Sequence, residues 1–207
     1  MRRTNIRPPN AIPHFRIELG SGFLLLLALI YFFDESGLLA SLFPVVLVHE
    51  LGHVFAMLFF GAYPTRLKAT LAGFTMDYSG DTSDRQEMMV ALAGPAFGFA
   101  FSLLCAWLGR RFDSEYLLMC AGLGFVLNIF NLLPDMSLDG GRVLDYFLRS
   151  AYGAENSLHI IRIVGLITVF LLLGFGLYRT ANGNGFSLFV AAIWLFVLQR
   201  NSLVNNP

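Results

Sequence analysis

Six apolar segments constrain what this chain can fold into. They cover residues 19–33, 37–61, 87–109, 116–133, 159–178 and 185–199. A helix of about 20 apolar residues crosses the hydrocarbon core of a bilayer, where the backbone must satisfy its own hydrogen bonds. The segments therefore predict an all-α polytopic membrane protein with about six transmembrane helices, of which the first and last are short. The chain has 207 residues, of which 56% are hydrophobic and 14% charged, so we expect one integral membrane domain over residues 1–207.

The basic residues between these segments indicate an orientation. If the N-terminus is cytoplasmic, eleven of the 14 Lys and Arg residues fall on the cytoplasmic side, and only Arg110, Arg111 and Arg179 fall on the other. The positive-inside rule then predicts a multi-pass protein of the cell membrane with both termini in the cytoplasm. The formal net charge is zero, which gives no indication of nucleic-acid binding.

The connection at residues 62–86 is more apolar than an ordinary loop. It contains two short runs, RLKATLA and FTMDYS, which we expect to join at Gly73. Each run partly alternates apolar and polar residues, which predicts a membrane-associated β-hairpin, although an irregular loop is the alternative. A hairpin here could bind an extended substrate by strand addition, with Leu71, Gly73 and Phe74 as the candidate contacts.

The second apolar segment contains the motif HELGH at residues 49–53. His49 and His53 are one helical turn apart and can reach one metal ion, while Glu50 can act as a general base without being a ligand. These three are the only His, Asp, Glu, Lys or Arg side chains between Glu35 and Arg66. Polar side chains at bilayer depth are costly and usually functional, and a shared metal would account for all three. The sequence therefore predicts one catalytic Zn²⁺ per chain.

A catalytic zinc needs a third protein ligand. The other histidines are poorly placed, because His14 precedes the first apolar segment and His159 opens the fifth. The end of the fourth segment reads NLLPDMSLDGG, in which a proline interrupts the helix and two glycines allow a tight turn. Chemistry alone leaves both Asp135 and Asp139 as candidates.

Taken together, the two motifs resemble those of the site-2 protease family, peptidase family M50, whose members are intramembrane zinc metalloproteases. Asn131, Pro134, Asp139 and Gly140 match the family's second motif, NxxPxxxxDG. The resemblance implies that Asp139 is the third zinc ligand, since Asp135 falls at an unconstrained motif position. The resemblance covers about residues 13–150.

The resemblance is strongest to the compact branch represented by stage IV sporulation protein FB. It implies a three-helix catalytic core within about residues 37–150, with additional C-terminal transmembrane helices at about 159–199. The short stretch Ala93-Gly94-Pro95 is similar to a turn that the family has in the span between its two motifs. A bacterial origin is expected.

The function implied is that of an intramembrane zinc metalloendopeptidase. It would cleave membrane-embedded or membrane-associated substrates near the cytoplasmic side, in regulated intramembrane proteolysis. Glu50 would be the catalytic residue and Asn131 a candidate oxyanion or substrate contact, although Asn131 could equally cap a helix. The implied partners are the lipid bilayer, a substrate such as a transcription-factor precursor or anti-sigma factor, and a regulatory membrane protein.

Two other functions are compatible with the metal motif. A divalent-cation transporter would need further polar residues along a path through several spans, and the first, third, fifth and sixth segments are nearly devoid of ionisable residues. A metal-binding pseudoprotease acting as an adaptor would not need Glu50, which is present.

Overall fold

The computed structural model describes residues 2–3, 15–34, 37–70, 73–183 and 185–205. Each of the six predicted apolar segments forms a helix. The helices are α1 Ser21–Phe33, α2 Leu38–Phe59, α3 Asp84–Phe112, α4 Glu115–Asn131, α5 Asp139–Tyr152, α6 Ala154–Ala181 and α7 Ser187–Asn205.

By length and composition, three of the described helices could cross a membrane. They are α2, α3 and α6, with 22, 29 and 28 residues. The apolar helix α4 has 17 residues and α1 has 13, which are short of the roughly 20 residues that cross the hydrocarbon core without tilt or thinning. The structure thus confirms a mostly helical protein with apolar spans, without showing all six predicted crossings.

The predicted β-hairpin is present between α2 and α3. Its strands, β3 Tyr63–Thr70 and β4 Gly73–Ser79, pair antiparallel. Gly73 is not the joint, because it is the first residue of β4 and pairs with Thr70. Leu71 lies outside the described residues. The prediction of a hairpin was therefore right, but Gly73 lies inside a strand and not at the joint.

The N-terminal arm adds two strands that the sequence did not predict. β2 Arg16–Leu19 pairs parallel with β3, and β1 Arg2–Arg3 pairs parallel with the end of β4, giving the strand order β1-β4-β3-β2. Ion pairs tie three of these strands together: Arg66 on β3 contacts Glu18 on β2 at 3.4 Å, and Lys68 contacts Asp77 on β4 at 3.5 Å. The hairpin is thus the centre of a four-stranded sheet.

A second difference from the expected fold is α5, which lies between the fourth and fifth apolar segments. It is amphipathic, with Gly141, Asp145 and Leu148 among its buried residues. At its C-terminal end Asp145 pairs with Arg149 at 2.6 Å and accepts a hydrogen bond from Ser157 of α6 at 2.6 Å. α5 is therefore held firmly at the corner where it joins α6.

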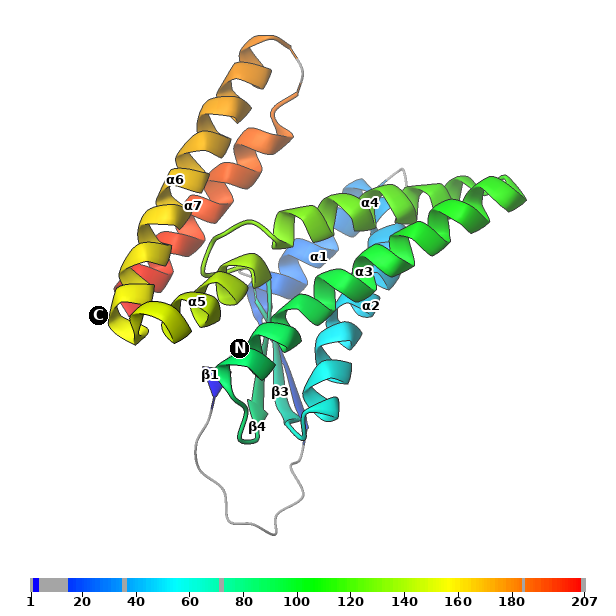
Figure 1. The fold of residues 1–207 in the computed structure, drawn as a ribbon. Coiled ribbons are helices and arrows are strands. Elements are labelled where there is room, and N and C mark those ends of the chain that lie inside the picture. Colours follow the sequence, from blue (N-terminus) through cyan, green and yellow to red (C-terminus); the bar gives the residue numbers. More distant parts are fainter. Residues whose placement is uncertain (1, 4–14, 35–36, 71–72, 184, 206–207) are drawn as a thin grey trace.

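Two helical groups are arranged around α5 (Figure 1). α2, α3 and α4 pack against one another, and α3 also packs on α5. α6 and α7 form a hairpin that rises away from the α2–α4 group (Figure 1), and a small apolar cluster links them, with Leu138 and Phe130 on one side and Val169 and Leu195 on the other. Most large apolar side chains that point outward lie on the helices, as expected for lipid-facing surfaces.

A buried carboxylate of α3 contacts both α5 and the loop that precedes α3. Glu87, 5% exposed, accepts hydrogen bonds from Thr82 just before α3 and from Tyr146 of α5. Burial and the neighbouring Glu87 raise the pKa of Tyr146 to about 12, so the phenol remains a donor at neutral pH. The contact between Glu87 and Tyr146 therefore helps to fix α5 relative to α3.

Candidate metal centre

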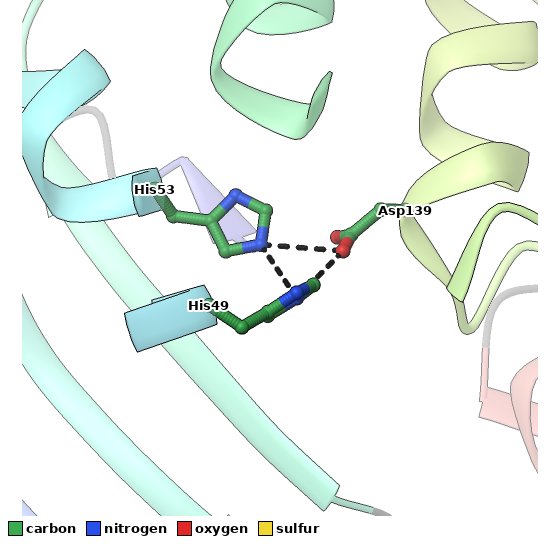
Figure 2. A group of neighbouring side chains, drawn as sticks. All are labelled: His49, His53 and Asp139. Atoms are coloured by element: carbon green, nitrogen blue, oxygen red, sulfur yellow. Dashed lines mark hydrogen bonds and ion pairs between the residues drawn. The ribbon is translucent and has the colours of Figure 1, made fainter. Parts of the chain in front are cut away.

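Three buried side chains from two helices meet at one point (Figure 2). Nε2 of His49 and Nε2 of His53 lie 3.2 Å apart, and Oδ2 of Asp139 lies 3.1 Å from the first and 3.2 Å from the second. All three residues are at most 7% exposed. Among the described residues they form a group that could hold a metal ion.

The helix α2 brings the two histidines together. Residues four apart lie on the same face one turn above each other, and both imidazoles point toward Asp139 (Figure 2). Glu50 is partly exposed and lines the cavity beside them, so it is near the group without being one of its three members. A glycine opposite makes room: a Cβ on Gly94 of α3 would overlap the His53 ring.

The turn between α4 and α5 presents Asp139 to the histidines. α4 ends at Asn131, three residues before Pro134, and Asp139 is the first residue of α5. Arg142, one turn along α5, lies 3.6 Å from Oδ1 of Asp139, which leaves Oδ2 toward the histidines. Burial alone would raise the pKa of Asp139, but the contacts with His49 and His53, aided by Arg142, hold this pKa below its usual value. The side chain is therefore a carboxylate anion, the form that can bind a metal ion.

The outer nitrogens of both histidines have hydrogen-bond partners. Nδ1 of His53 donates to the backbone carbonyl of Val90 at 2.8 Å. Nδ1 of His49 donates to Oδ1 of Asn128 at 2.9 Å. Such partners fix the orientation of metal-binding histidines and are part of most metal sites. Asn128 is not among the site residues predicted from the sequence; its one signal there is an amide one helical turn before Asn131 in a largely apolar helix.

The chemistry and spacing of the donor atoms fit a metal such as zinc. Two imidazole nitrogens and one carboxylate oxygen are the ligands of many catalytic zinc sites. In a tetrahedral site with bonds of about 2.0–2.2 Å, ligand atoms lie roughly 3.3–3.6 Å apart. The observed separations of 3.1–3.2 Å are close to this. Three protein ligands also leave a fourth position for water or substrate.

A cavity of about 520 Å³ opens beside the ligands. Its lining includes the polar residues Glu50, Asn131 and Arg142, and Nδ2 of Asn131 lies 3.3 Å from Nε2 of His49. The rest of the wall is largely apolar and comes from α2, α4, α7 and the hairpin. These apolar lining residues are Leu38, Leu42, Val46, Phe74, Met76, Leu123, Val126, Leu127, Phe130, Leu138, Ala191 and Trp194. Of the hairpin candidates, Phe74 therefore reaches the cavity.

The two candidate aspartates have different surroundings. Asp135 is fully buried, and its Oδ1 accepts a hydrogen bond from the backbone N–H of Ser137 at 2.9 Å, so it closes the turn instead of joining the histidines. His159 lies exposed on α6, and His14 is outside the described residues. Ala93-Gly94-Pro95 lies within the continuous helix α3, so the turn expected from the resemblance is not present.

Comparisons with known proteins relate this chain to zinc metalloproteases. The sequence model described as Peptidase family M50 matches residues 110–175. A zinc metalloprotease of Methanocaldococcus jannaschii is 29% identical over 142 residues, which is 66% of this chain and 41% of that protein. Rip3 of Mycobacterium tuberculosis, named as a candidate zinc metalloprotease, is 26% identical over 185 residues, or 81% of this chain and 44% of that protein.

The fold matches a solved structure over nearly its whole length. The site-2 protease from Methanocaldococcus jannaschii superposes with a TM-score of 0.71 at 24% identity, covering 93% of this chain and 92% of that one. The resemblance to the site-2 protease family that the motifs predicted is thereby confirmed. The chain spans less than half the length of the two sequence relatives.

Proposed function

We propose that this protein is an intramembrane zinc metalloendopeptidase of the site-2 protease type. The observation that carries this proposal is the convergence of His49, His53 and Asp139, which line a largely apolar cavity together with Glu50. His49, His53 and Asp139 are the residues that would hold one Zn²⁺.

The mechanism assigns a task to each residue around the ligands. Zinc bound there would lower the pKa of a water molecule and polarise the scissile carbonyl group. Glu50 accepts the proton of the attacking water and later donates it to the leaving amine. Asn131 donates an N–H to the carbonyl oxygen as negative charge develops on it. Arg142 holds Asp139 through Oδ1, so that Oδ2 keeps its direction.

The cavity and the hairpin together suggest how a substrate binds. A helical substrate must unwind locally, because its scissile amide is otherwise engaged in helical hydrogen bonds. β3 is paired along both of its sides, whereas in the described structure the outer side of β4 is paired only at Asp77 and Tyr78, by β1. The rest of β4, with Phe74 and Met76 on the cavity wall, is therefore the proposed strand for substrate addition.

We further propose six transmembrane helices with both termini in the cytoplasm, in the cell membrane of a bacterium. The distribution of basic residues supports this orientation, and it places the hairpin and α5 on the cytoplasmic side. Residues 37–150 would then form the catalytic core of a single membrane domain, completed by the helices at 159–199. The short helices α1 and α4 would cross by local thinning of the bilayer or with their flanking residues.

The proposed substrates are membrane proteins with a transmembrane or membrane-associated segment. A transcription-factor precursor or an anti-sigma factor is the expected kind, and cleavage would release it in regulated intramembrane proteolysis. A membrane protein that regulates access to the cavity is a further expected partner. The largely apolar cavity wall supports an apolar substrate segment.

Experiments on purified protein distinguish the proposed protease from a cation transporter and from a non-catalytic adaptor. We expect one zinc per chain, cleavage of a reconstituted single-span substrate, and no zinc uptake into proteoliposomes. Glu50→Gln is the matched control, since it should keep zinc and lose cleavage. Zinc uptake without cleavage would favour the transporter, and full cellular activity of Glu50→Gln would favour the adaptor. Mass spectrometry of membrane proteins from cells with wild-type or Glu50→Gln enzyme would then identify substrates.

A further inference from the structure

We propose that Asn128 is a positioning residue that sets the tautomer of His49, so that Nε2 of this histidine is free to bind a metal. This inference rests on the proposed zinc site but not on peptide hydrolysis. Asn128 is fully buried on α4 and does not line the cavity, so it acts through His49 and not on a substrate.

The surroundings of Asn128 determine which end of its amide faces the histidine. Nδ2 lies 2.6 Å from the backbone carbonyl oxygen of Gly124. A carbonyl oxygen can only accept a hydrogen bond, so the amide NH₂ group must face Gly124 and the amide oxygen must face His49. The oxygen and nitrogen of a side-chain amide are told apart by their hydrogen-bond partners, and here the Gly124 carbonyl alone identifies the nitrogen.

The orientation of the amide in turn decides where His49 carries its proton. The Oδ1 atom of Asn128 can only accept, and it lies 2.9 Å from Nδ1 of His49. Nδ1 is therefore the protonated nitrogen. A neutral imidazole carries one proton, so Nε2 presents a lone pair, and Nε2 is the atom that lies 3.1 Å from Asp139 and 3.2 Å from Nε2 of His53.

The packing between α3 and α4 holds the amide in this place. A Cβ on Gly98 of α3 would overlap the Asn128 amide group, so the absence of a side chain there creates its space. The side chain is fully buried, and a reversed amide would put its NH₂ against a donor and its oxygen against the Gly124 carbonyl. The network thus allows one orientation.

Both histidines donate a hydrogen bond from Nδ1, but the acceptors are of different kinds. His53 is set by a main-chain acceptor, the carbonyl of Val90 at 2.8 Å, which no substitution removes. His49 is set by a side chain, so its tautomer depends on the residue at position 128. A residue that only filled space between helices would not need its oxygen directed at a histidine.

The test uses two variants of full-length protein in detergent and one matched control. Asn128→Leu keeps a similar volume and removes the acceptor. Asn128→Asp keeps the acceptor oxygen and, when protonated, also a donor toward Gly124. Ser102→Ala is the control, because Ser102 is buried one turn along α3 from Gly98, donates to the Gly98 carbonyl at 2.8 Å and does not touch the ligands.

We expect Asn128→Leu to weaken zinc binding by about 10- to 100-fold in chelator competition, the usual loss when a partner of a ligating histidine is removed. Asn128→Asp and Ser102→Ala should bind zinc within about threefold of wild type, since each keeps the acceptor for His49. Wild-type affinity in Asn128→Leu, or an equal loss in Ser102→Ala, would overturn the proposal.

A second measurement needs neither cleavage nor a folded leucine variant. Nitrogen-15 NMR of imidazole-labelled, zinc-loaded wild-type protein reports which ring nitrogen of His49 carries the proton and which binds the metal. We expect the proton on Nδ1 and the metal on Nε2 in wild type and in Asn128→Asp. A proton on Nε2 with the metal on Nδ1 in wild type would refute the assignment. A protein that shows the expected tautomer but cleaves nothing would count against the proposed function alone.

Discussion

The Oδ2 atom of Asp139 lies 3.1 Å from Nε2 of His49, although 90 positions separate the two residues in the chain. The contact joins the middle of α2 to the first residue of α5 (Figure 2). Buried polar groups are costly unless they have partners, and a divalent cation would be a partner for both of these side chains. The relative placement of α2 and α5 is therefore the structural condition for the proposed zinc site.

The two aspartates of the α4–α5 turn give a matched comparison. Asp139→Asn removes an anionic ligand and should weaken zinc binding by more than the roughly 10- to 100-fold caused by losing an outer partner. Asp135→Asn keeps the Oδ1 acceptor for the Ser137 N–H and should leave zinc affinity unchanged. Chelator competition on both variants measures the difference. A larger loss in Asp135→Asn would mean that the ligand assignment is wrong.

Glu50→Gln tests the general base. Glutamine has nearly the shape of glutamate but cannot accept the proton of water, and general-base catalysis contributes about 10²- to 10⁴-fold to a rate. We therefore expect cleavage to fall by this factor while zinc content stays at one per chain. Single-turnover cleavage of a reconstituted substrate, together with metal analysis, measures both quantities. Loss of zinc in this variant would instead place Glu50 among the ligands.

The helices and the metal motif could be predicted from the sequence because each depends on residues that are close together in the chain. Apolar runs of about 20 residues and the i, i+4 spacing of His49 and His53 both follow from helix geometry. The hairpin also followed from local alternation. Its turn was misplaced because Gly73 pairs with Thr70 inside the sheet, although a glycine in such a connection usually indicates the turn itself.

The missed features depend on contacts between distant segments. β1 and β2 exist because the hairpin offers edges to pair with, and the polar N-terminal arm has little strand signal of its own. The helix α5 was overlooked because it is amphipathic and not apolar, and only its contact with α3 shows which face is buried. The choice between Asp135 and Asp139 likewise needed the family resemblance, because both aspartates follow the same helix break.

Gly94→Ala tests whether the site depends on close approach of α2 and α3. The added methyl group would overlap the His53 ring, and overpacking of this kind costs about 1–3 kcal/mol. If the ring moves to relieve the overlap, zinc affinity should fall by about tenfold or more. Gly122→Ala on α4 is the control, because nothing lies within 4 Å of its added Cβ. Zinc titration and thermal unfolding of both variants measure the effect.

An unchanged zinc affinity in Gly94→Ala would show that His53 can adapt, and would weaken the case for His53 as a tightly positioned ligand. The control should behave differently in stability as well. Alanine is a better helix former than glycine, so Gly122→Ala should unfold at an equal or slightly higher temperature. Equal damage in both variants would point to general sensitivity of the helix packing.

Phe74→Ala tests the role of the hairpin in substrate binding. Phe74 is on β4, lines the cavity and packs edge-to-face on Phe23 of α1 at a ring separation of 5.5 Å. Removing the ring deletes apolar surface that an extended substrate would contact, so we expect KM to rise about 10-fold with zinc content unchanged. Phe59→Ala is the control, since Phe59 is 76% exposed at the end of α2 and does not line the cavity. Cleavage kinetics that change equally in both variants, or only in kcat, would contradict substrate binding by β4.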